Sequence, residues 1–328
     1  MLCKLSRIGL IGLSLTLGGA AARAQVVWEM PTEYPATAIP GEGLTFFAGA
    51  VEKRLSGKLT IRPSFNAERG LKSGDMPDAV VQGKIAAADA FGGGLGNVHV
   101  AFALSSLPFL TASFEDARRL AEVGRPLYEK VLAEKGLRLL YVTPWPPSGI
   151  WSKGAITGAS SLEGLTIRTY DATSMEVFNA AGAKASNLSF ADVMPRLKDG
   201  SITAVLSSGD GGAGRKLWDF LPHFSAANYA FPLSFAFVSK AAFEALPEDQ
   251  RKAVEEAARE TEARQWAAMA GRLEQNQAQM RANGVTIAPA LPTDALARLQ
   301  KVAAPAVEQW ASKVGPAGAE VLRRFQAR

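Results

Sequence analysis

The chain has few of the residue types that most often build metal and redox sites. Its 328 residues include one cysteine, Cys3, and two histidines, His99 and His223. No metal-binding motif surrounds either histidine, so we expect no metal site. Cys3 falls in a segment that we expect to be removed, and without it the chain can form no disulfide, thiolate metal site or cysteine nucleophile.

Long apolar runs are absent beyond the amino terminus. Residues 1–24 have the pattern of a secretory signal peptide, in which Lys4 and Arg7 precede an apolar core at 8–17 and an Ala-Arg-Ala cleavage signal follows. That core is too short to span a bilayer. We therefore expect a chain that is exported to the periplasm and is not itself embedded in a membrane.

Neither sign of charge dominates the sequence. The chain has 36 Lys and Arg against 31 Asp and Glu, a formal net charge of +5. The basic residues are scattered, with no run and no interleaved aromatic residues, so we expect no binding of nucleic acid.

Catalytic motifs are also missing. The glycine-rich segment 92–96, GGGLG, lacks the Lys-Ser/Thr of a P-loop and the third glycine of a dinucleotide fingerprint. Ser207-Ser208-Gly209 lacks the first glycine of a nucleophile elbow. The sequence therefore predicts no catalytic residue and no cofactor.

The pattern of apolar residues predicts an α/β protein with two domains. Short strands alternate with helices in the first third, which favours a mainly parallel sheet, and the alternation restarts near residue 166. A last, very long helix is predicted at 248–282, long enough to run across two domains. We expect strands at 26–30, 59–65, 85–91, 136–142, 166–168, 184–188, 202–207 and 229–238, and helices at 43–55, 78–82, 113–135, 174–181, 190–199 and 248–282.

The segment SLEGLTIRTYD, residues 161–171, predicts a ligand site. Leu165 and Ile167 alternate with polar residues as in a strand, and Arg168 stands where that strand ends. Ligands of open α/β sheets bind at the carboxyl ends of strands, and an arginine fork fits a carboxylate or phosphate. The segment alone also allows a surface arginine or half of a structural ion pair.

Six segments of the chain resemble, in order, those of the extracytoplasmic receptors of TRAP (tripartite ATP-independent periplasmic) transporters. SLEGLTIR is close to the most characteristic of them. The resemblance implies a type II-like periplasmic-binding-protein fold, with two α/β domains joined by hinge strands and a domain-spanning helix. The expected domains are 25–145 plus 233–272 and 146–232 plus 273–328, with the ligand cleft between them. The six segments are SGKLTIRPSF, VVQGKIAAAD, SSLPFL, SLEGLTIR, AGAKASNLSFADVMPRLKDGSITA and ALPEDQRKAVEEAA.

The resemblance also implies a set of binding residues. The arginine that closes the characteristic strand binds the ligand carboxylate in this family, and here it is Arg168. Phe190 stands where relatives place an aromatic ring against the ligand, although core packing explains it equally well. The remaining candidates lie at strand ends or near the first crossover between domains. They are Ser207, Ser208, Trp28, Phe91, Gly92, Trp145, Ser148 and Trp151. The competing reading is a capped strand end for the two serines at 207 and 208, and packing at the hinge for Trp145 and Trp151.

Departures from the family pattern bear on the ligand. Phe91 stands where sugar-acid receptors carry a polar group, and no arginine occurs at 148–151, near the position of their second arginine. We therefore expect one cation in the site and a small organic monocarboxylate with an apolar or aromatic body. The expected partners are TRAP membrane permease subunits, with the receptor itself a monomer. A binding subunit of a sensor system and, less favoured, a periplasmic enzyme acting on a carboxylic acid are the alternatives.

Overall fold

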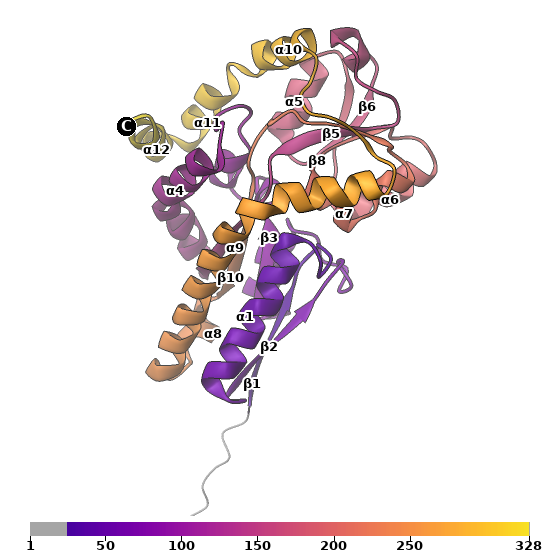
Figure 1. Cartoon of the computed structure of the whole chain (residues 1–328). Coiled ribbons are helices and arrows are strands. Elements are labelled where there is room, and N and C mark those ends of the chain that lie inside the picture. The colour runs from indigo at the N-terminus through magenta and orange to yellow at the C-terminus, as the bar shows by residue number, and fades with distance from the viewer. Residues whose placement is uncertain (1–24, 328) are drawn as a thin grey trace, which may run out of the picture.

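The computed structural model describes residues 25–327, and the chain forms two domains that lie one above the other in Figure 1. The first domain contains a parallel pair, β1-β2, and a three-stranded sheet in the order β3-β10-β4. A single bridge from Thr32 to Asp89 joins the two parts. The strands are β1 (Val26–Pro31), β2 (Leu59–Ser64), β3 (Ala87–Phe91), β4 (Leu137–Pro144) and β10 (Leu233–Ser239).

The first-domain sheet differs from the mainly parallel sheet that we expected. Strand β10 runs antiparallel to both β3 and β4. The chain leaves the first domain after β4 and returns to it through β10. Strand β10 therefore runs in the opposite direction. Helices cover both faces of this sheet. They are α1 (Ile39–Leu55), α2 (Met76–Val81), α3 (Gly92–Leu95), the 3₁₀ segment η1 (Val100–Ser106), α4 (Phe114–Glu134) and α8 (Lys240–Glu244).

The second domain has one sheet in the order β11-β9-β5-β8-β6-β7. Strands β6, β7 and β8 are parallel and end at the same edge, whereas β5 is antiparallel to β8. The strands β5, β9 and β11 were not predicted. The strands are β5 (Ser148–Ser152), β6 (Thr166–Thr169), β7 (Lys184–Asn187), β8 (Ala204–Ser208), β9 (His223–Ser225) and β11 (Thr286–Ala288). The helices are η2 (Ala159–Leu162), α5 (Ala172–Ala180), α6 (Phe190–Lys198), α7 (Gly209–Gly214), η3 (Leu217–Asp219) and α10 (Thr293–Ala303).

Helix α9 (Glu248–Ala282) contacts both domains. Pro247 precedes it, and Glu248 and Asp249 in its first turn interact favourably with the positive end of the helix dipole. At 1.5 Å per residue it is roughly 50 Å long. It packs on α1 and β4 in the first domain and on α7 and β11 in the second. Figure 1 shows α9, in orange, passing from one domain to the other, as the sequence predicted.

The last two helices, α11 (Ala306–Val314) and α12 (Pro316–Gln326), pack on the first domain. They contact η1 and α4, and Figure 1 shows α12 beside α4. The indole Nε1 of Trp310 donates to the carbonyl of Val100 at 2.9 Å. The expectation placed 273–328 in the second domain, but of the three C-terminal helices only α10 packs there, on η2 and α5. We propose that Ala306–Gln326 belongs to the first domain.

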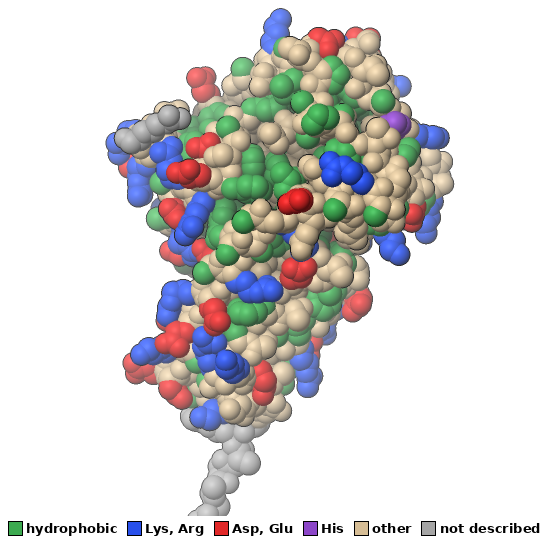
Figure 2. All heavy atoms as spheres, viewed as in Figure 1, with side chains coloured by type: hydrophobic (Ala, Val, Ile, Leu, Met, Phe, Trp, Pro, Cys, Tyr) green, Lys and Arg blue, Asp and Glu red, His purple; other side chains and the backbone are tan. Residues whose placement is uncertain are grey.

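Apolar side chains fill both faces of the first-domain sheet and the centre of the second domain. The second-domain core also includes Tyr34, Ile39 and Phe91 from the first domain, so the domains touch through apolar groups. The surface is mixed in charge: Figure 2 shows acidic and basic side chains interspersed over the first domain. The predicted α/β class and two-domain fold are confirmed.

Candidate functional site

A small cavity lies between the domains. Strand ends and loops of both domains form its walls. Three of the strands, β6, β8 and β5, belong to the six-stranded sheet. The cavity therefore lies where the sequence placed a ligand cleft. Its lining consists of Tyr34, Phe91, Trp145, Ser148, Arg168, Tyr170, Phe190, Ser207, Ser208, Gly211 and Pro232.

Arg168 is the cation of this cavity wall. It lies on β6 between its neighbours on β7 and β8 and is 3% exposed. Its Nε donates to the carbonyl of Leu188 at 2.9 Å and its Nη1 to the carbonyl of Leu206 at 3.2 Å. Among residues 25–327, no carboxylate oxygen lies within 4.0 Å of its nitrogens. The side chain is thus oriented by two backbone groups, and the rest of its fork has no anionic partner from the described chain.

Burial lowers the pKa of Arg168 from its ordinary value, and the nearby Glu33 and Asp171 oppose that shift. A guanidinium nevertheless stays protonated in proteins. The carboxyl of Asp171 is itself buried, which raises its pKa to about 6. Its Oδ1 accepts from the backbone N–H of Ser174 at 2.7 Å and so caps α5. Asp171 is therefore committed to the helix, and the positive charge of Arg168 is left for a ligand.

Aromatic rings form most of the remaining wall. The guanidinium carbon of Arg168 lies 4.9 Å from the ring centre of Phe190. Tyr34 packs against Trp145 with ring centres 4.6 Å apart, and Phe91 against Tyr170 at 5.4 Å. Such rings offer a ligand broad apolar contact at little cost in side-chain entropy.

Polar groups are few and lie on one side. Ser208 caps α7 by accepting from the backbone N–H of Gly211 at 3.1 Å. The indole N–H of Trp145 donates to Ser234 Oγ at 3.0 Å, so Trp145 presents its ring to the cavity. Ser148 and Ser207 line the cavity, and the hydroxyl of Tyr170 is buried without a hydrogen-bond partner among the described residues. These hydroxyls can meet one or two neutral polar atoms of a ligand.

Seven of the ten predicted residues lie on the cavity wall. They are Arg168, Phe190, Ser207, Ser208, Phe91, Trp145 and Ser148. Their contact with a ligand stays a prediction.

The other three predicted residues do not line the cavity. Trp28 is buried in the first-domain core. At Gly92 a Cβ would lie 2.9 Å from the carbonyl oxygen of Leu233, so the residue serves backbone packing. The indole of Trp151 donates to the carbonyl of Ser208 at 3.2 Å and covers the Phe224 ring. It supports α7 from behind.

The sequence reasoning missed several wall residues and one cation. Tyr170 is two residues beyond Arg168, and the period-2 alternation that singled out Arg168 could have found it. Tyr34 and Pro232 lie in irregular segments without a comparable pattern. Arg215, just after α7, has its guanidinium carbon 5.3 Å from the ring centre of Phe190. Arg215 lies behind the wall and does not line the cavity, so the expectation of a single cation at this site stays a prediction.

A second hollow adjoins the cavity, since five residues line both. It shares Arg168, Phe190 and Tyr34 with the inner cavity and adds Glu33, Lys72, Ser73 and Asp192, among others. The ammonium of Lys72 lies 2.8 Å from a carboxylate oxygen of Asp192, so an ion pair joins the two domains there. We call this hollow the mouth of the cavity.

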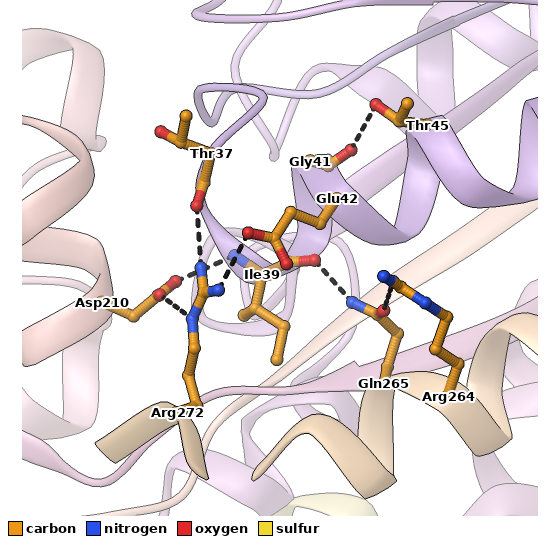
Figure 3. Close-up of polar contacts among 9 residues, drawn as sticks. All are labelled: Thr37, Ile39, Gly41, Glu42, Thr45, Asp210, Arg264, Gln265 and Arg272. Atoms are coloured by element: carbon orange, nitrogen blue, oxygen red, sulfur yellow. Dashed lines mark hydrogen bonds and ion pairs between the residues drawn. The ribbon is translucent and has the colours of Figure 1, made fainter. Parts of the chain in front are cut away.

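A partly buried ionic cluster joins the domains on another side. Arg272 on α9 contacts Asp210 of α7 at 2.5 Å and Glu42 of α1 at 2.9 Å. Figure 3 shows the Arg272 guanidinium between Asp210, Glu42 and the carbonyl of Thr37. Asp210 also accepts from the backbone N–H of Ile39 at 2.9 Å. Helix α7, whose first residues meet the cavity, is thus tied to the start of α1.

Neither a metal cluster nor a membrane-spanning helix occurs in the described part of the chain. Within residues 25–327, no group of three or more His, Cys, Asp or Glu side chains could hold a metal ion. No helix in the same range has both the length and the apolar character needed to cross a membrane.

Comparison with known proteins identifies the family. The sequence model of the bacterial extracellular solute-binding proteins, family 7, matches residues 31–313. This chain belongs to that family. Its members are the solute receptors of TRAP transporters, so the resemblance seen in the six segments is confirmed. The family works outside the cytoplasm, whereas the predicted signal peptide at 1–24 lies outside the described residues.

Three similar proteins illustrate the match. A solute-binding protein of Verminephrobacter eiseniae is 24% identical over 331 residues, 98% of this chain and 96% of that one. An extracytoplasmic solute receptor of Bordetella pertussis that binds pyroglutamic acid is 29% identical, with a TM-score of 0.88 over 92% of this chain and 99% of that one. A TRAP solute-binding protein from a marine metagenome, specific for pyroglutamate, is 28% identical, with a TM-score of 0.87 over 93% and 99%. All three are described as solute-binding proteins or solute receptors.

Proposed function

We propose that this TRAP receptor binds a small organic monocarboxylate between its domains and delivers it to membrane permease subunits. The observation that carries the proposal is Arg168, a buried and pre-oriented guanidinium without a carboxylate partner in the described chain. Leaving such a charge unpaired in an apolar cavity is costly, and a ligand carboxylate relieves that cost through two charge-assisted hydrogen bonds.

The cavity also favours a compact ligand body. The cavity is small, five of its eleven lining residues are aromatic, and its serine hydroxyls are those of Ser148, Ser207 and Ser208. A sugar acid would bring more hydroxyls than this wall can satisfy, and each buried polar group left unpaired weakens binding. A second carboxylate would meet Asp171 and Glu33 near Arg168. A small acid with an apolar body, or with one neutral polar group, fits best.

Pyroglutamate is the first ligand to test, because two relatives at 28% and 29% identity bind it. It carries one carboxylate and a neutral lactam on a small ring. Its carboxylate would pair with Arg168, and its lactam would meet the hydroxyl side of the cavity. Closure of the domains would then bury it, driven by contacts that form only when both domains touch the ligand.

Two measurements test the proposal. Native mass spectrometry of the purified chain would detect a co-purified acid and give its mass. A thermal-shift panel would compare pyroglutamate and simple aromatic and aliphatic monocarboxylates with succinate and glucuronate. We expect monocarboxylates to raise the melting temperature in a concentration-dependent way. A response confined to the dicarboxylate or the sugar acid would refute the proposed ligand class.

A further inference from the structure

Glu33 is a buried carboxylate at the mouth of the cavity that contacts no ligand in the binding proposal. It follows β1 in the first domain and is 2% exposed. Its Oε2 accepts from the N–H and the hydroxyl of Ser73, at 3.1 and 2.9 Å. Ser73 is also a first-domain residue, and its hydroxyl in turn accepts from the N–H of Phe91 at 3.1 Å. Glu33 is thus held in place within its own domain.

The other oxygen of Glu33 reaches across to the second domain. Its Oε1 accepts from the backbone N–H of Ala191 at 3.0 Å. Ala191 lies in the first turn of α6, where backbone N–H groups have no partner within the helix and the helix dipole is positive. A carboxylate from the opposite domain therefore satisfies a helix end that would otherwise face the mouth.

The backbone of Glu33 makes a second contact between the domains. Its carbonyl oxygen accepts from the guanidinium of Arg215, which lies just after α7. The Arg215 guanidinium also lies over the ring of Phe190, the first residue of α6 and part of the cavity wall. Both contacts of Glu33 thus lead to groups that place Phe190 beside Arg168.

We propose that Glu33, the Ala191 N–H and Arg215 form a closure latch that holds the cavity shut and sets how fast ligand leaves. This inference rests on the proposed function. Glu33 is a positioning residue here, because its oxygens are already bonded to protein groups and it does not line the inner cavity. The contacts of Glu33 with Ala191 and Arg215 join the two domains, so opening the cleft would break them. They should slow dissociation and leave association nearly unchanged.

The Lys72–Asp192 pair at the mouth contributes less. Its side chains are 43% and 38% exposed, and such exposed pairs are weak and screened by salt. Glu33 is buried, so its hydrogen bonds are shielded from water and are the stronger ones. The latch therefore depends on Glu33 rather than on the ion pair.

Dissociation rates of matched variants test the latch. Glu33→Gln keeps the side-chain size and replaces one acceptor oxygen with a donor. Ala191→Pro removes the N–H that Glu33 accepts from, at a helix turn that tolerates proline. The control is Glu29→Gln on β1, the strand that Glu33 follows, because Glu29 pairs with Arg62 and Arg69 on the surface of the first domain. Stopped-flow tryptophan fluorescence follows ligand binding, since Trp145 lines the cavity. The probes are pyroglutamate and every other acid that raises the melting temperature of the wild-type chain.

We expect dissociation to accelerate about ten- to hundred-fold in Glu33→Gln, the value of one hydrogen bond to a charged group. Association should change little, and the effect should be the same for every acid. The double variant with Ala191→Pro should be scarcely worse than either single variant, because both remove the same bond. Glu29→Gln should behave as wild type.

Three outcomes would overturn the latch. One is an unchanged dissociation rate in Glu33→Gln. Another is a slowed association with unchanged dissociation, and the third is a loss confined to one acid, which would make Glu33 a ligand contact. If the wild-type chain itself binds no monocarboxylate, the proposed function fails and the latch falls with it. Failure of the latch alone looks different: the wild-type chain binds the acid, and Glu33→Gln binds it equally well.

Discussion

Replacing Arg168 with lysine and with glutamine gives the sharpest test of how the site recognises its ligand. Two of the guanidinium N–H groups are engaged by the carbonyls of Leu188 and Leu206, so the outer part of the fork remains for the ligand. Two charge-assisted hydrogen bonds to a carboxylate, at about 1.5–3 kcal/mol each, make this fork the largest polar contribution to binding. Both variants should fold, because the wild-type charge has no carboxylate partner among the described residues.

Lysine keeps the charge but loses the fork, and glutamine loses both. We expect Arg168→Lys to weaken binding by about 2 kcal/mol, roughly 30-fold in Kd. Arg168→Gln should weaken it by about 3–5 kcal/mol, since it removes the partner of a desolvated carboxylate. Isothermal titration calorimetry with pyroglutamate, or with the acid found by mass spectrometry, measures both. The control is Arg62→Gln, a surface arginine whose side chain is 62% exposed.

The role assigned to Arg168 is refuted if the Kd of Arg168→Gln lies within a factor of about three of the wild-type Kd. The assigned role is also refuted if Arg168→Lys and Arg168→Gln weaken binding equally while both variants melt at the wild-type temperature. The positive charge would then contribute nothing to binding beyond the geometry of the fork.

Three further predictions concern stability and the cavity wall. Burial raises the pKa of Asp89 to about 7, so the folded chain holds this proton more tightly than the unfolded chain does, and stability falls as pH rises from about 4 to 7. In thermal melts, the stability of Asp89→Asn relative to wild type should increase by about 2–3 kcal/mol between pH 5 and pH 8. The same dependence of stability on pH in both proteins would contradict this. Arg272→Met should cost about 3 kcal/mol in urea unfolding, because it leaves the carboxylate of Asp210 buried without its cation, and a loss below about 1 kcal/mol would refute that view. Gly211→Ala places a Cβ 2.5 Å from Ser207 Oγ and should weaken binding about tenfold by calorimetry, whereas Gly49→Ala, with open space around it, should not.

The elements of the fold were largely predictable because their signals are local. The helix that begins after Pro247 was predicted with its observed limits, and the strand that ends in Arg168 was found from its alternation. Strand β5, Ser148–Ser152, was missed because it is buried on both faces and shows no alternation. The direction of β10 and the docking of α11 and α12 depend on where the chain returns in space, which local patterns do not encode.

The site was predictable only where chemistry and position coincide. Arg168 was found because a cation at a strand end in an apolar segment is unusual. Trp28 was proposed from its place on a strand expected to face the cleft and Trp151 from its place near the first crossover between domains, yet both are core residues. Tyr34 and Arg215 reach the site through loops, and only the folded chain brings them together with Phe190.

The path of the chain between the domains has a consequence for folding. The first domain needs β10 and the helices α11 and α12, and the second needs β11 and α10, so both draw on the last third of the chain. Helix α9 packs on both domains and joins their cores mechanically. Neither domain can therefore complete its fold until nearly the whole chain is available. We expect the two domains to melt in one cooperative transition, with no stable half-folded species to expose the apolar cavity walls.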